Sequence, residues 1–315
     1  MKVLITGGAG FIGCNFVRHM LKAHPGTEIV VLDKLTYAGR LENLEKIKDK
    51  IKFVKGDICD KETVRKVMPG CEQVVNFAAE SHVDRSIASP EDFVRTDVLG
   101  VFTMLEEARR TDVKKFVQIS TDEVYGSTVS GSFKEGDTLD PSSPYSASKA
   151  GGELLARSYF KTYGMNVMVT RSSNNYGPFQ FPEKLIPVLI LKALRNEKLP
   201  IYGKGTNVRD WLHVEDNCRA IDLVLEKGKP GNVLNVGSGN EVPNIEVAKL
   251  VLKHMKKPES LISYVKDRPG HDFRYSLEWD AIKKLGWTPK IKFEDGLRKT
   301  VDWYLANEWW WRPLV

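Results

Sequence analysis

The N-terminal stretch MKVLITGGAGFIG, residues 1–13, decides the fold of this chain. Residues 2–5 form a short apolar run that ends in glycines, which is typical of a buried parallel strand. Apolar residues then recur at helical spacing from Phe11 to Leu21. The stretch therefore predicts a strand, a tight turn and a helix whose N-terminus directs N–H groups and a positive dipole end at a phosphate.

Three glycines, Gly7, Gly10 and Gly13, lie in the predicted turn with the spacing GxxGxxG. Such glycines permit a tight turn, close approach of a pyrophosphate and close packing of the helix on the strand. A purely structural turn also favours glycine, so the motif alone decides little. The rest of the chain must show whether a dinucleotide binds here.

An acidic residue at the end of the second predicted strand supports a dinucleotide site. Residues 28–32 form another apolar run, and Asp33 follows it about 20 residues beyond Gly13. A carboxylate at this place accepts hydrogen bonds from the ribose hydroxyls of NAD and repels the extra phosphate of NADP. We therefore expect NAD as the cofactor.

Two further strand ends complete the expected cofactor site. Asp57 follows the strand predicted at 51–55 and either faces the adenine or caps the helix that begins near Lys61; the sequence leaves both open. The strand predicted at 74–79 ends in small residues that let a ligand lie close. The residues expected to contact the cofactor are Gly7, Gly10, Phe11, Ile12, Gly13, Asp33, Asp57, Ile58, Ala78, Ala79, Thr96, Tyr145, Lys149 and Asn175.

Composition excludes several classes of protein. The chain has 315 residues, 42% of them hydrophobic, which is enough for two domains or one large α/β domain. No stretch approaches the ~20 apolar residues of a membrane span. The net charge of +6 is spread along the chain and does not indicate nucleic-acid binding. Residues 1–2 run directly into the first strand, so we expect no signal peptide and a cytoplasmic protein.

The cysteines of the chain are Cys14, Cys59, Cys71 and Cys218. They show neither CxxC spacing nor paired histidines. We therefore expect inert thiols in a reducing compartment, and no metal site.

Strands and helices alternate over the first part of the chain. This alternation predicts an α/β fold: a Rossmann-like, doubly wound parallel sheet with helices on both faces. We assign residues 1–172 to an NAD-binding domain and expect a later strand near 233–236 to join its sheet. Residues 173–315 are less regular and should form mainly a smaller C-terminal substrate-binding lobe, interleaved with the first domain.

Tyr145 and Lys149 lie four residues apart on the helix predicted over 144–164, so their side chains share one face. A free tyrosine has a pKa near ~10 and is a poor base at neutral pH. The lysine ammonium and the positive nicotinamide of an oxidised cofactor favour the phenolate, which can deprotonate an alcohol as hydride leaves the same carbon. A YxxxK spacing also occurs by chance on solvated helix faces. Thr121 adds weight, because its hydroxyl is placed to bind the same substrate oxygen.

Asp122 and Glu123 are the discriminating feature of the chain. They follow the strand predicted at 115–120, at the sheet edge where ligands of open α/β sheets bind. An isolated Asp-Glu would be read as ordinary loop carboxylates. Two carboxyls in different environments can divide the acid and base roles, so beside Tyr145 and Lys149 the pair predicts an elimination coupled to redox chemistry.

The chain resembles the extended short-chain dehydrogenases/reductases, and specifically the dTDP-glucose 4,6-dehydratase family. The triplet of residues 121–123 is the most specific match, because epimerases of this superfamily lack the Asp-Glu pair. Sugar-nucleotide decarboxylases and GDP-mannose dehydratases typically have Ser in place of the Asp. The matching segments cover nearly the whole chain: TGGAGFIG (6–13), AAESHVDRS (78–86), TDEVYG (121–126), YSASK (145–149), RSSNNYGP (171–178), PEKLIP (182–187), RDWLHVED (209–216) and RPGHD (268–272).

The resemblance implies NAD-dependent dehydration of dTDP-glucose to dTDP-4-keto-6-deoxyglucose. Tyr145, with Lys149, would deprotonate the C4 hydroxyl while hydride passes from C4 to NAD. Glu123 would then remove the C5 proton, and Asp122 would protonate the leaving C6 hydroxyl before hydride returns to C6. The catalytic residues expected are Thr121, Asp122, Glu123, Tyr145 and Lys149.

The resemblance also places a substrate site in the later part of the chain. Arg209 and Arg268 suit a diphosphate through bidentate bonds, although a single arginine also suits a surface salt bridge. Tyr202 would either flank the nucleobase or pack in a core, and the tryptophans at 309–311 are expected to pack. The substrate-binding residues expected are Ser81, Thr121, Asn174, Lys184, Leu185, Pro200, Tyr202, Arg209, Asn244, Arg268 and His271.

Two other functions compete with this interpretation. A UDP-sugar 4-epimerase or UDP-glucuronate decarboxylase would have the same fold, and a non-catalytic NAD-binding regulatory protein would usually have lost the tyrosine or the lysine. The sequence does not separate dTDP from UDP, nor does it identify the deoxysugar pathway, such as dTDP-rhamnose biosynthesis. The resemblance further implies a homodimer, paired through the apolar faces of the helices predicted over 90–110 and 144–164.

Overall fold

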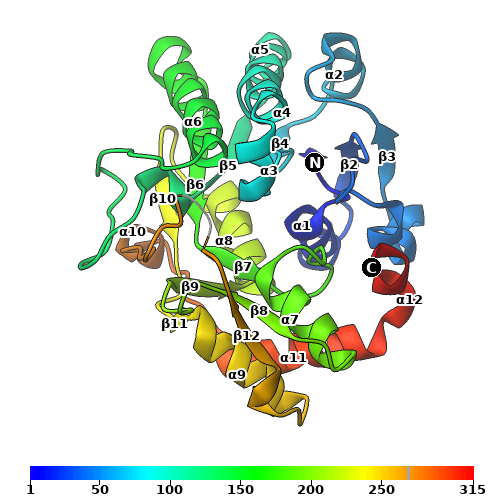
Figure 1. Ribbon diagram of the computed structural model, residues 1–315. Helices are drawn as coiled ribbons and strands as arrows, with labels where there is room; N and C mark the ends of the chain where they lie inside the picture. The colour runs from blue at the N-terminus through cyan, green and yellow to red at the C-terminus, as the bar shows by residue number, and fades with distance from the viewer. Residues whose placement is uncertain (268–269) are drawn as a thin grey trace.

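A computed structural model describes residues 1–267 and 270–315 of the chain. Within them, a central sheet holds seven strands in the order β10-β6-β5-β4-β1-β2-β3 (Figure 1). Every pairing in this sheet is parallel, which confirms the predicted doubly wound, Rossmann-like fold. The strands are β1 (Lys2–Thr6), β2 (Glu28–Asp33), β3 (Lys52–Lys55), β4 (Gln73–Asn76), β5 (Lys115–Thr121), β6 (Val167–Ser172) and β10 (Val233–Val236).

Helices cover both faces of the sheet, because successive side chains of a strand point to opposite faces. Val3 and Ile5 of β1 pack with one set of helices, whereas Leu4 packs with the other. The first set is α1 (Phe11–Ala23) and α8 (Val214–Lys227). The second set, at the top of Figure 1, is α2 (Lys61–Val67), α5 (Val101–Arg110) and α6 (Pro144–Tyr163).

The helix predicted over 90–110 is interrupted. It consists of α4 (Glu91–Val94), a π-helical segment η3 (Arg95–Gly100) and α5. Its backbone lies against α6, since a Cβ atom on Gly152 would be 2.2 Å from the carbonyl oxygen of Asp97. The wider π turn, a feature often found at functional sites, turns the Asp97 side chain inward.

The later part of the chain builds two small sheets and a second hydrophobic core. One sheet joins β7 (Asn174–Tyr176), β9 (Val208–His213) and β11 (Glu241–Pro243); the other joins β8 (Leu199–Tyr202) and β12 (Ile262–Val265). The core packs side chains of these strands, including Trp211 and Ile201, between helices. Those helices are α7 (Leu185–Leu194), α9 (Asn244–His254), α11 (Phe293–Ala306) and α12 (Glu308–Trp311).

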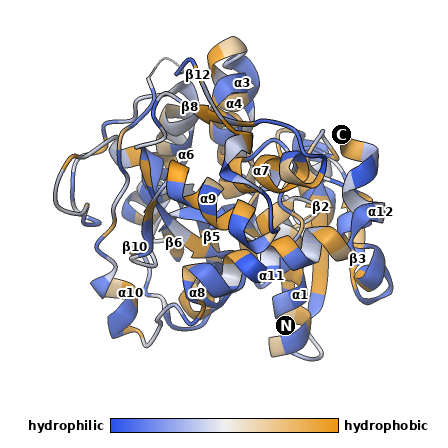
Figure 2. Ribbon diagram, turned by 60° about the horizontal axis from the view of Figure 1, so that its bottom comes forward, coloured by the Kyte–Doolittle hydropathy of each residue, from blue (hydrophilic) through white to orange (hydrophobic). Residues whose placement is uncertain are grey.

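Hydropathy follows this packing. Figure 2 shows hydrophobic and hydrophilic residues alternating along α8 and α11, while α7 is hydrophobic over most of its length. Strand β10 and helix α8 belong to the later part of the chain yet pack with the first sheet, so the division at residue 172 stays a prediction. Among the helices of the described residues, none combines the length and apolar character needed to span a bilayer.

Candidate active site

The glycine-rich turn brings three elements into contact. Gly7 has a φ of +64°, a backbone conformation that favours glycine. A Cβ atom on Gly7 would lie 2.6 Å from the backbone nitrogen of Ala78, and one on Gly13 would lie 2.2 Å from the Gly7 carbonyl oxygen. Side chains at these positions would push β1, α1 and the end of β4 apart. The turn therefore leaves bare backbone facing a ligand, as a pyrophosphate requires.

Asp33 ends β2 directly beneath this turn. Its carboxylate accepts hydrogen bonds from the backbone N–H of Ala9 at 2.9 Å and of Leu35 at 2.8 Å. Burial raises the pKa of Asp33, and the two backbone hydrogen bonds offset part of that rise. One oxygen faces the glycine turn and the other the following loop, so the carboxylate is held in a fixed orientation. It fits the ribose of NAD, with lone pairs left to accept from hydroxyl groups.

The structure separates the two alternatives for Asp57. The helix α2 is capped by Asp60, whose side chain accepts from the backbone N–H of Glu62 at 3.1 Å, so the alternative in which Asp57 caps this helix is wrong. Asp57 instead binds Lys34 at 2.8 Å and the backbone N–H of Cys59 at 2.9 Å. Burial would raise its pKa, but these contacts lower it overall. An ionised Asp57 thus lies at the edge of the cofactor region.

Asp122 is a buried carboxyl whose surroundings favour its neutral form. It opens the one-turn helix η4 (Asp122–Tyr125) after β5, and Thr121 donates a 3.1 Å hydrogen bond to its Oδ1. Its Oδ2 is buried and has no hydrogen-bond partner among the described residues. Burial raises the pKa of Asp122 well above the ordinary carboxyl range, and the charges of Glu123 and Asp210 raise it further. These surroundings favour the protonated form of Asp122, which can donate a proton.

Tyr145 and Lys149 lie on one face of α6, as predicted. Ser143 caps this helix by accepting from the backbone N–H of Ser146 at 3.1 Å. Burial raises the pKa of Tyr145 well above 10, as do the charges of Glu123 and Asp97, while a hydrogen bond with Thr121 lowers it in part. The effect expected of Lys149 on the phenol does not prevail, because burial and the nearby carboxylates raise the pKa of Tyr145. The Lys149 ammonium donates to the carbonyl oxygen of Ile119 at 2.7 Å.

A second pair of acidic residues lies beside the lysine, and sequence reasoning missed it. Asp97 is buried and accepts from the backbone N–H of Glu80 at 3.1 Å and from the Ser148 hydroxyl at 2.7 Å. Burial raises the pKa of Asp97 to about 6, against the charge of Lys149. Burial and then Asp97 raise the pKa of Glu80 to about 7. The π turn that carries Asp97 gives no signal in the sequence pattern.

Apart from Asp97, the functional side chains described above line one cavity of about 310 Å³. It receives all of the residues predicted to bind the cofactor, all of the predicted catalytic residues, and Ser81, Asn174 and Lys184 of the predicted substrate site. Among residues 1–267 and 270–315, no cluster of histidine, cysteine or acidic side chains is arranged to hold a metal ion. Lining residues that were not predicted are Leu32, Lys34, Thr36, Ala38, Gly39, Gly56, Phe77, Glu80, Ile119, Ser120, Ser172, Ser173, Gln180, Phe181 and Glu183.

Comparisons with known proteins agree with this geometry. A family model described as GDP-mannose 4,6-dehydratase matches residues 4–300. A dTDP-glucose 4,6-dehydratase of Streptomyces niveus is 49% identical over 321 residues, which cover 100% of this chain and 96% of that protein. The chain belongs to the dTDP-glucose 4,6-dehydratase family.

Two further proteins are similar to this chain over nearly its whole length. The low-salt glycan biosynthesis protein Agl12 of Haloferax volcanii is 50% identical, over 98% of this chain and 100% of that protein. The dTDP-glucose 4,6-dehydratase DesIV of Streptomyces venezuelae, solved with NAD and TYD bound, superposes with a TM-score of 0.98 at 48% identity, covering 100% of both chains.

The remaining predicted substrate residues that the structure describes do not line the cavity. Leu185 begins α7 beside it, Pro200 and Tyr202 lie on β8, and Asn244 begins α9. Tyr202 is 44% exposed, so it does not pack in a core, and its ring meets that of His271 edge-on at 6.0 Å. The Oδ1 atom of Asn244 is buried without a hydrogen-bond partner among the described residues. Arg268 lies outside the described residues.

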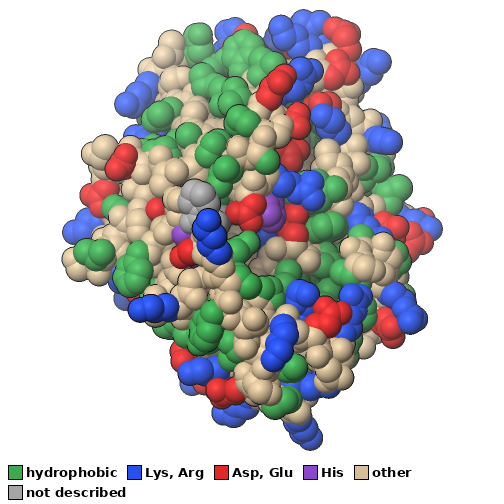
Figure 3. Space-filling model, viewed as in Figure 1, with side chains coloured by type: hydrophobic (Ala, Val, Ile, Leu, Met, Phe, Trp, Pro, Cys, Tyr) green, Lys and Arg blue, Asp and Glu red, His purple; other side chains and the backbone are tan. Residues whose placement is uncertain are grey.

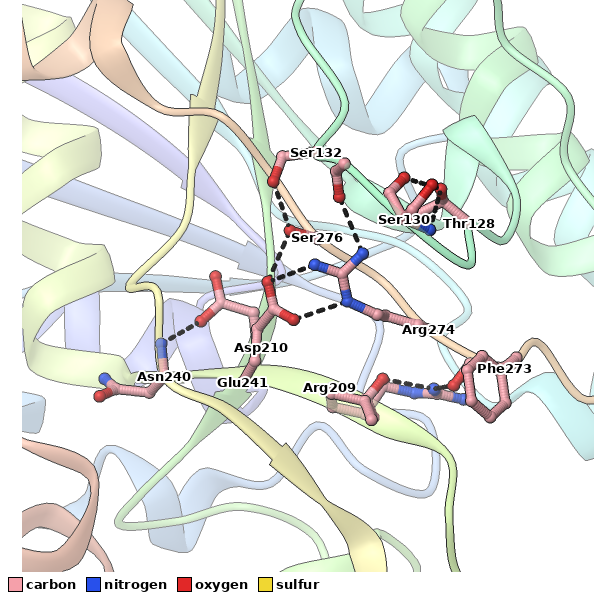
Figure 4. A network of polar contacts seen from close by, with 12 residues as sticks. Thr128, Ser130, Ser132, Arg209, Asp210, Asn240, Glu241, Phe273, Arg274 and Ser276 are labelled. Atoms are coloured by element: carbon pink, nitrogen blue, oxygen red, sulfur yellow. Dashed lines mark hydrogen bonds and ion pairs between the residues drawn. The ribbon is translucent and has the colours of Figure 1, made fainter.

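Arg209 is already engaged within the protein. Its guanidinium donates to the carbonyl oxygens of Asp272 at 3.0 Å and Val208 at 2.8 Å, and it lies 4.3 Å from the ring of Tyr275. It is only 6% exposed. Figure 4 shows it on the strand that continues into Asp210, next to the loop around Phe273. As a diphosphate ligand, Arg209 would have to share its donors with these carbonyls.

Proposed function

We propose that this protein catalyses the NAD-dependent dehydration of dTDP-glucose to dTDP-4-keto-6-deoxyglucose. The observation that carries the proposal is the buried Asp122, whose Oδ2 has no hydrogen-bond partner among the described residues, beside Glu123 in the same cavity as Tyr145 and Lys149. This set combines an acid, a second carboxyl and a hydroxyl-directed base. The relatives named dTDP-glucose 4,6-dehydratase, and the DesIV structure with NAD and TYD, support the choice of substrate and cofactor.

The protein holds the cofactor by its backbone and by two carboxylates. The bare backbone of Gly7 and Gly13 would accommodate the pyrophosphate, Asp33 would accept from the adenosine ribose, and Asp57 would lie towards the adenine. When bound, NAD would accept hydride from C4 of the sugar, add a positive charge that favours the Tyr145 phenolate, and return the hydride to C6. The carboxylate of Asp33 disfavours the extra phosphate of NADP.

Oxidation at C4 begins with proton removal. Tyr145 takes the proton of the C4 hydroxyl, and Thr121, which is hydrogen-bonded to Tyr145, binds the same oxygen. Lys149 is fixed to the end of β5 by its bond to Ile119, and it lines the same cavity as Tyr145. The proton at C5 becomes acidic once C4 is a ketone.

Elimination then uses the two carboxyls in opposite senses. Glu123 removes the C5 proton, and Asp122 donates its proton to the leaving C6 oxygen, so that water is lost. A proton returns to C5 when hydride is delivered to C6. Asp122 is suited to the acid role because burial favours its protonated form and its Oδ2 has no partner among the described residues.

The decisive experiment follows the hydrogen on C4. Purified protein is incubated in parallel with dTDP-glucose and UDP-glucose, each labelled with deuterium at C4. We expect a 4-keto-6-deoxy product from dTDP-glucose that carries the label at C6, without net release of NADH. Label retained at C4 of an epimer would instead identify an epimerase, and equal turnover of both substrates would overturn the choice of dTDP.

The epimerase alternative has one observation in its favour. A UDP-glucose 4-epimerase of Thermus thermophilus superposes with a TM-score of 0.90 at 32% identity, over 98% of this chain and 100% of that chain. The shared fold and cofactor turn explain this similarity. The Asp122–Glu123 pair is what separates the two activities, so the labelling experiment tests that pair directly.

We further propose that the protein forms a homodimer. Val94, Leu99 and Leu154 are 55%, 45% and 51% exposed, and they lie on α4, η3 and α6. Hydrophobic side chains gather at the top of Figure 3, over the position of α5 and α6 in Figure 1. We expect a second copy to cover this apolar face across a two-fold axis. Leu154→Glu should convert the dimer to a monomer in light scattering, whereas Leu305→Glu, at another exposed leucine, should not.

We also propose a cytoplasmic location and a place in deoxysugar biosynthesis. The four cysteines are free thiols, and burial raises the pKa of Cys14 to about 12, which suits a reducing compartment. The similarity to Agl12, a glycan biosynthesis protein, leaves more than one pathway for the product. Cell fractionation followed by immunodetection tests the location.

A further inference from the structure

The C-terminal helix α12 lies beside the N-terminal cofactor region. Figure 1 shows α12 and the C-terminus next to the segment that follows β2. Trp310 is fully buried there, and its indole N–H donates a 2.6 Å hydrogen bond to Oδ1 of Asn43, 267 residues away. A buried Trp N–H paired with a buried side-chain amide is a specific contact, because either group left alone would be costly.

The contact continues into the glycine-rich turn. Asn43, which is 1% exposed, donates through Nδ2 to the carbonyl oxygen of Ala9 at 2.7 Å. The backbone N–H of Ala9 donates to Oδ2 of Asp33 at 2.9 Å. One unbroken chain of hydrogen bonds therefore runs from Trp310 through Asn43 and Ala9 to the carboxylate that faces the ribose.

Arg40 supplies a second tie between the same parts. Its backbone N–H donates to the Ala9 carbonyl oxygen at 3.0 Å, and its guanidinium donates to the Trp310 carbonyl oxygen at 2.9 Å. Both lone pairs of the Ala9 carbonyl are thus used by a segment that the C-terminal helix holds. The Ala9 peptide has little freedom to rotate while α12 stays in place.

The tail itself is firmly anchored. The Trp310 ring meets Trp303 at 5.1 Å and Phe179 at 5.7 Å, and the Trp311 indole donates to the Tyr304 carbonyl oxygen at 2.7 Å. The Tyr304 hydroxyl donates to the carbonyl oxygen of Gln180, a residue that lines the cavity. These contacts belong to the second hydrophobic core, so α12 connects that core to the glycine-rich turn.

We infer that Trp310 and Asn43 are positioning residues for the cofactor: they fix the Ala9 peptide, and with it the turn and Asp33, in the geometry that binds the dinucleotide. The inference rests on the proposed NAD cofactor. A purely structural tail would stabilise the fold without changing affinity for NAD, and the two cases predict different measurements.

The test compares two tryptophan variants of the full chain. Trp310→Phe keeps an aromatic ring in the core but removes the N–H donor. Trp309→Phe is the matched control, because Trp309 is 49% exposed and its indole bonds only within the tail, to Asn307. Affinities of the stripped proteins for NAD and for dTDP, each added alone, are measured by calorimetry, together with the melting temperature. We expect Trp310→Phe to weaken NAD binding about tenfold and to leave dTDP binding unchanged. Trp309→Phe should change neither.

A second variant keeps the test sharp if Trp310→Phe folds poorly. Asn43→Asp retains the acceptor for Trp310 but loses the donor to Ala9, so it should weaken NAD binding to a similar extent. The double variant should lose no more than either single variant, because both break one chain of bonds. Unchanged NAD affinity in both single variants, with wild type binding NAD, would overturn the inference alone. A wild-type protein that does not bind NAD would overturn the proposed cofactor as well.

Discussion

The cofactor region and the sugar-nucleotide region of this molecule place their expected ligands in different ways. In the first, side chains at the carboxyl ends of β1, β2, β4 and β5 converge on one cavity. In the second, Tyr202, Arg209, Asn244 and His271 are spread over small sheets, a helix start and a loop. Strand ends of a parallel sheet meet at one edge by construction, whereas the second region depends on how separate elements pack.

Polar side chains of the second region already form hydrogen bonds and ion pairs within the protein. Figure 4 shows Arg274 paired with Glu241, with Ser276 and Ser132 extending the network towards the loop before α6. In the same view, the Arg209 guanidinium donates hydrogen bonds to backbone carbonyl oxygens. The cofactor region presents backbone and carboxyl groups to a ligand, while this region presents groups that a ligand would have to share.

The largest expected effect lies at the carboxyl pair of the cavity. Glu123→Gln and Asp122→Asn should each slow dehydration about 10²–10⁴-fold, because each removes one positioned acid or base. Glu123→Gln should still transfer deuterium from C4 to NAD but should not exchange the C5 proton with solvent. Asp122→Asn should exchange that proton and eliminate water slowly. Mass spectrometry of the sugar checks both labels.

Tyr145→Phe is the matched variant for this prediction. It removes the hydroxyl that starts the reaction, so neither C4 transfer nor C5 exchange should occur. If Glu123→Gln also failed to transfer the C4 label, the pair would act in oxidation and its assignment to elimination would be wrong.

Two arginine–carboxylate pairs allow the regions to be compared by stability. Arg171 and Glu153 are both fully buried, and the guanidinium also donates to the Tyr125 hydroxyl, which joins α6 to η4. Arg171→Met should lower the free energy of unfolding by about 3–5 kcal/mol, because it leaves the buried Glu153 carboxylate with only the longer, 3.5 Å contact to Arg157 that the described residues show. Arg274→Met should cost at most about 1 kcal/mol, since that pair is partly exposed. Urea unfolding measures both free energies. Equal losses would show that the Arg274–Glu241 pair stabilises the protein as much as the buried Arg171–Glu153 pair does.

The sequence predicts the cofactor region well for a physical reason. A glycine turn, an acidic strand end and a YxxxK helix are local patterns, and the parallel sheet places them together without further information. Asp97 and Glu80 escaped prediction because a π turn and a loop bring them to Lys149, and neither has a period or motif. The engagement of Arg209 depends on a loop more than 60 residues away, as its bond to Asp272 shows. The sequence therefore predicts the motif residues of the site, but not the residues that contact them in the folded chain.

Asp97 gives a prediction that depends on pH. Burial raises the pKa of Asp97 from an ordinary 3.8 to about 6. Its contribution to the free energy of unfolding is therefore fully present below about pH 4 and is lost as the pH rises through 6. Asp97→Asn stays neutral at every pH. Relative to wild type it should therefore become more stable between pH 4 and pH 7, by up to about 3 kcal/mol. Melting curves across this range test it, with Asp112→Asn, at a side chain that is 86% exposed, as the control. A difference that stays constant with pH would mean that Asp97 titrates normally.

The smallest effect decides whether Arg209 is a ligand at all. Lysine keeps the positive charge but cannot form a planar, bidentate contact with a diphosphate while also bonding two carbonyls. If Arg209 holds the substrate, Arg209→Lys should raise KM for dTDP-glucose about tenfold, or about 1.4 kcal/mol, with kcat nearly unchanged. Arg274→Lys is the control, because Arg274 pairs with Glu241 and lies in the neighbouring network. We expect the rise in KM for Arg209→Lys alone. A lower melting temperature with an unchanged KM would place Arg209 among the groups that hold the loop, and the second region would then bind its substrate through other residues.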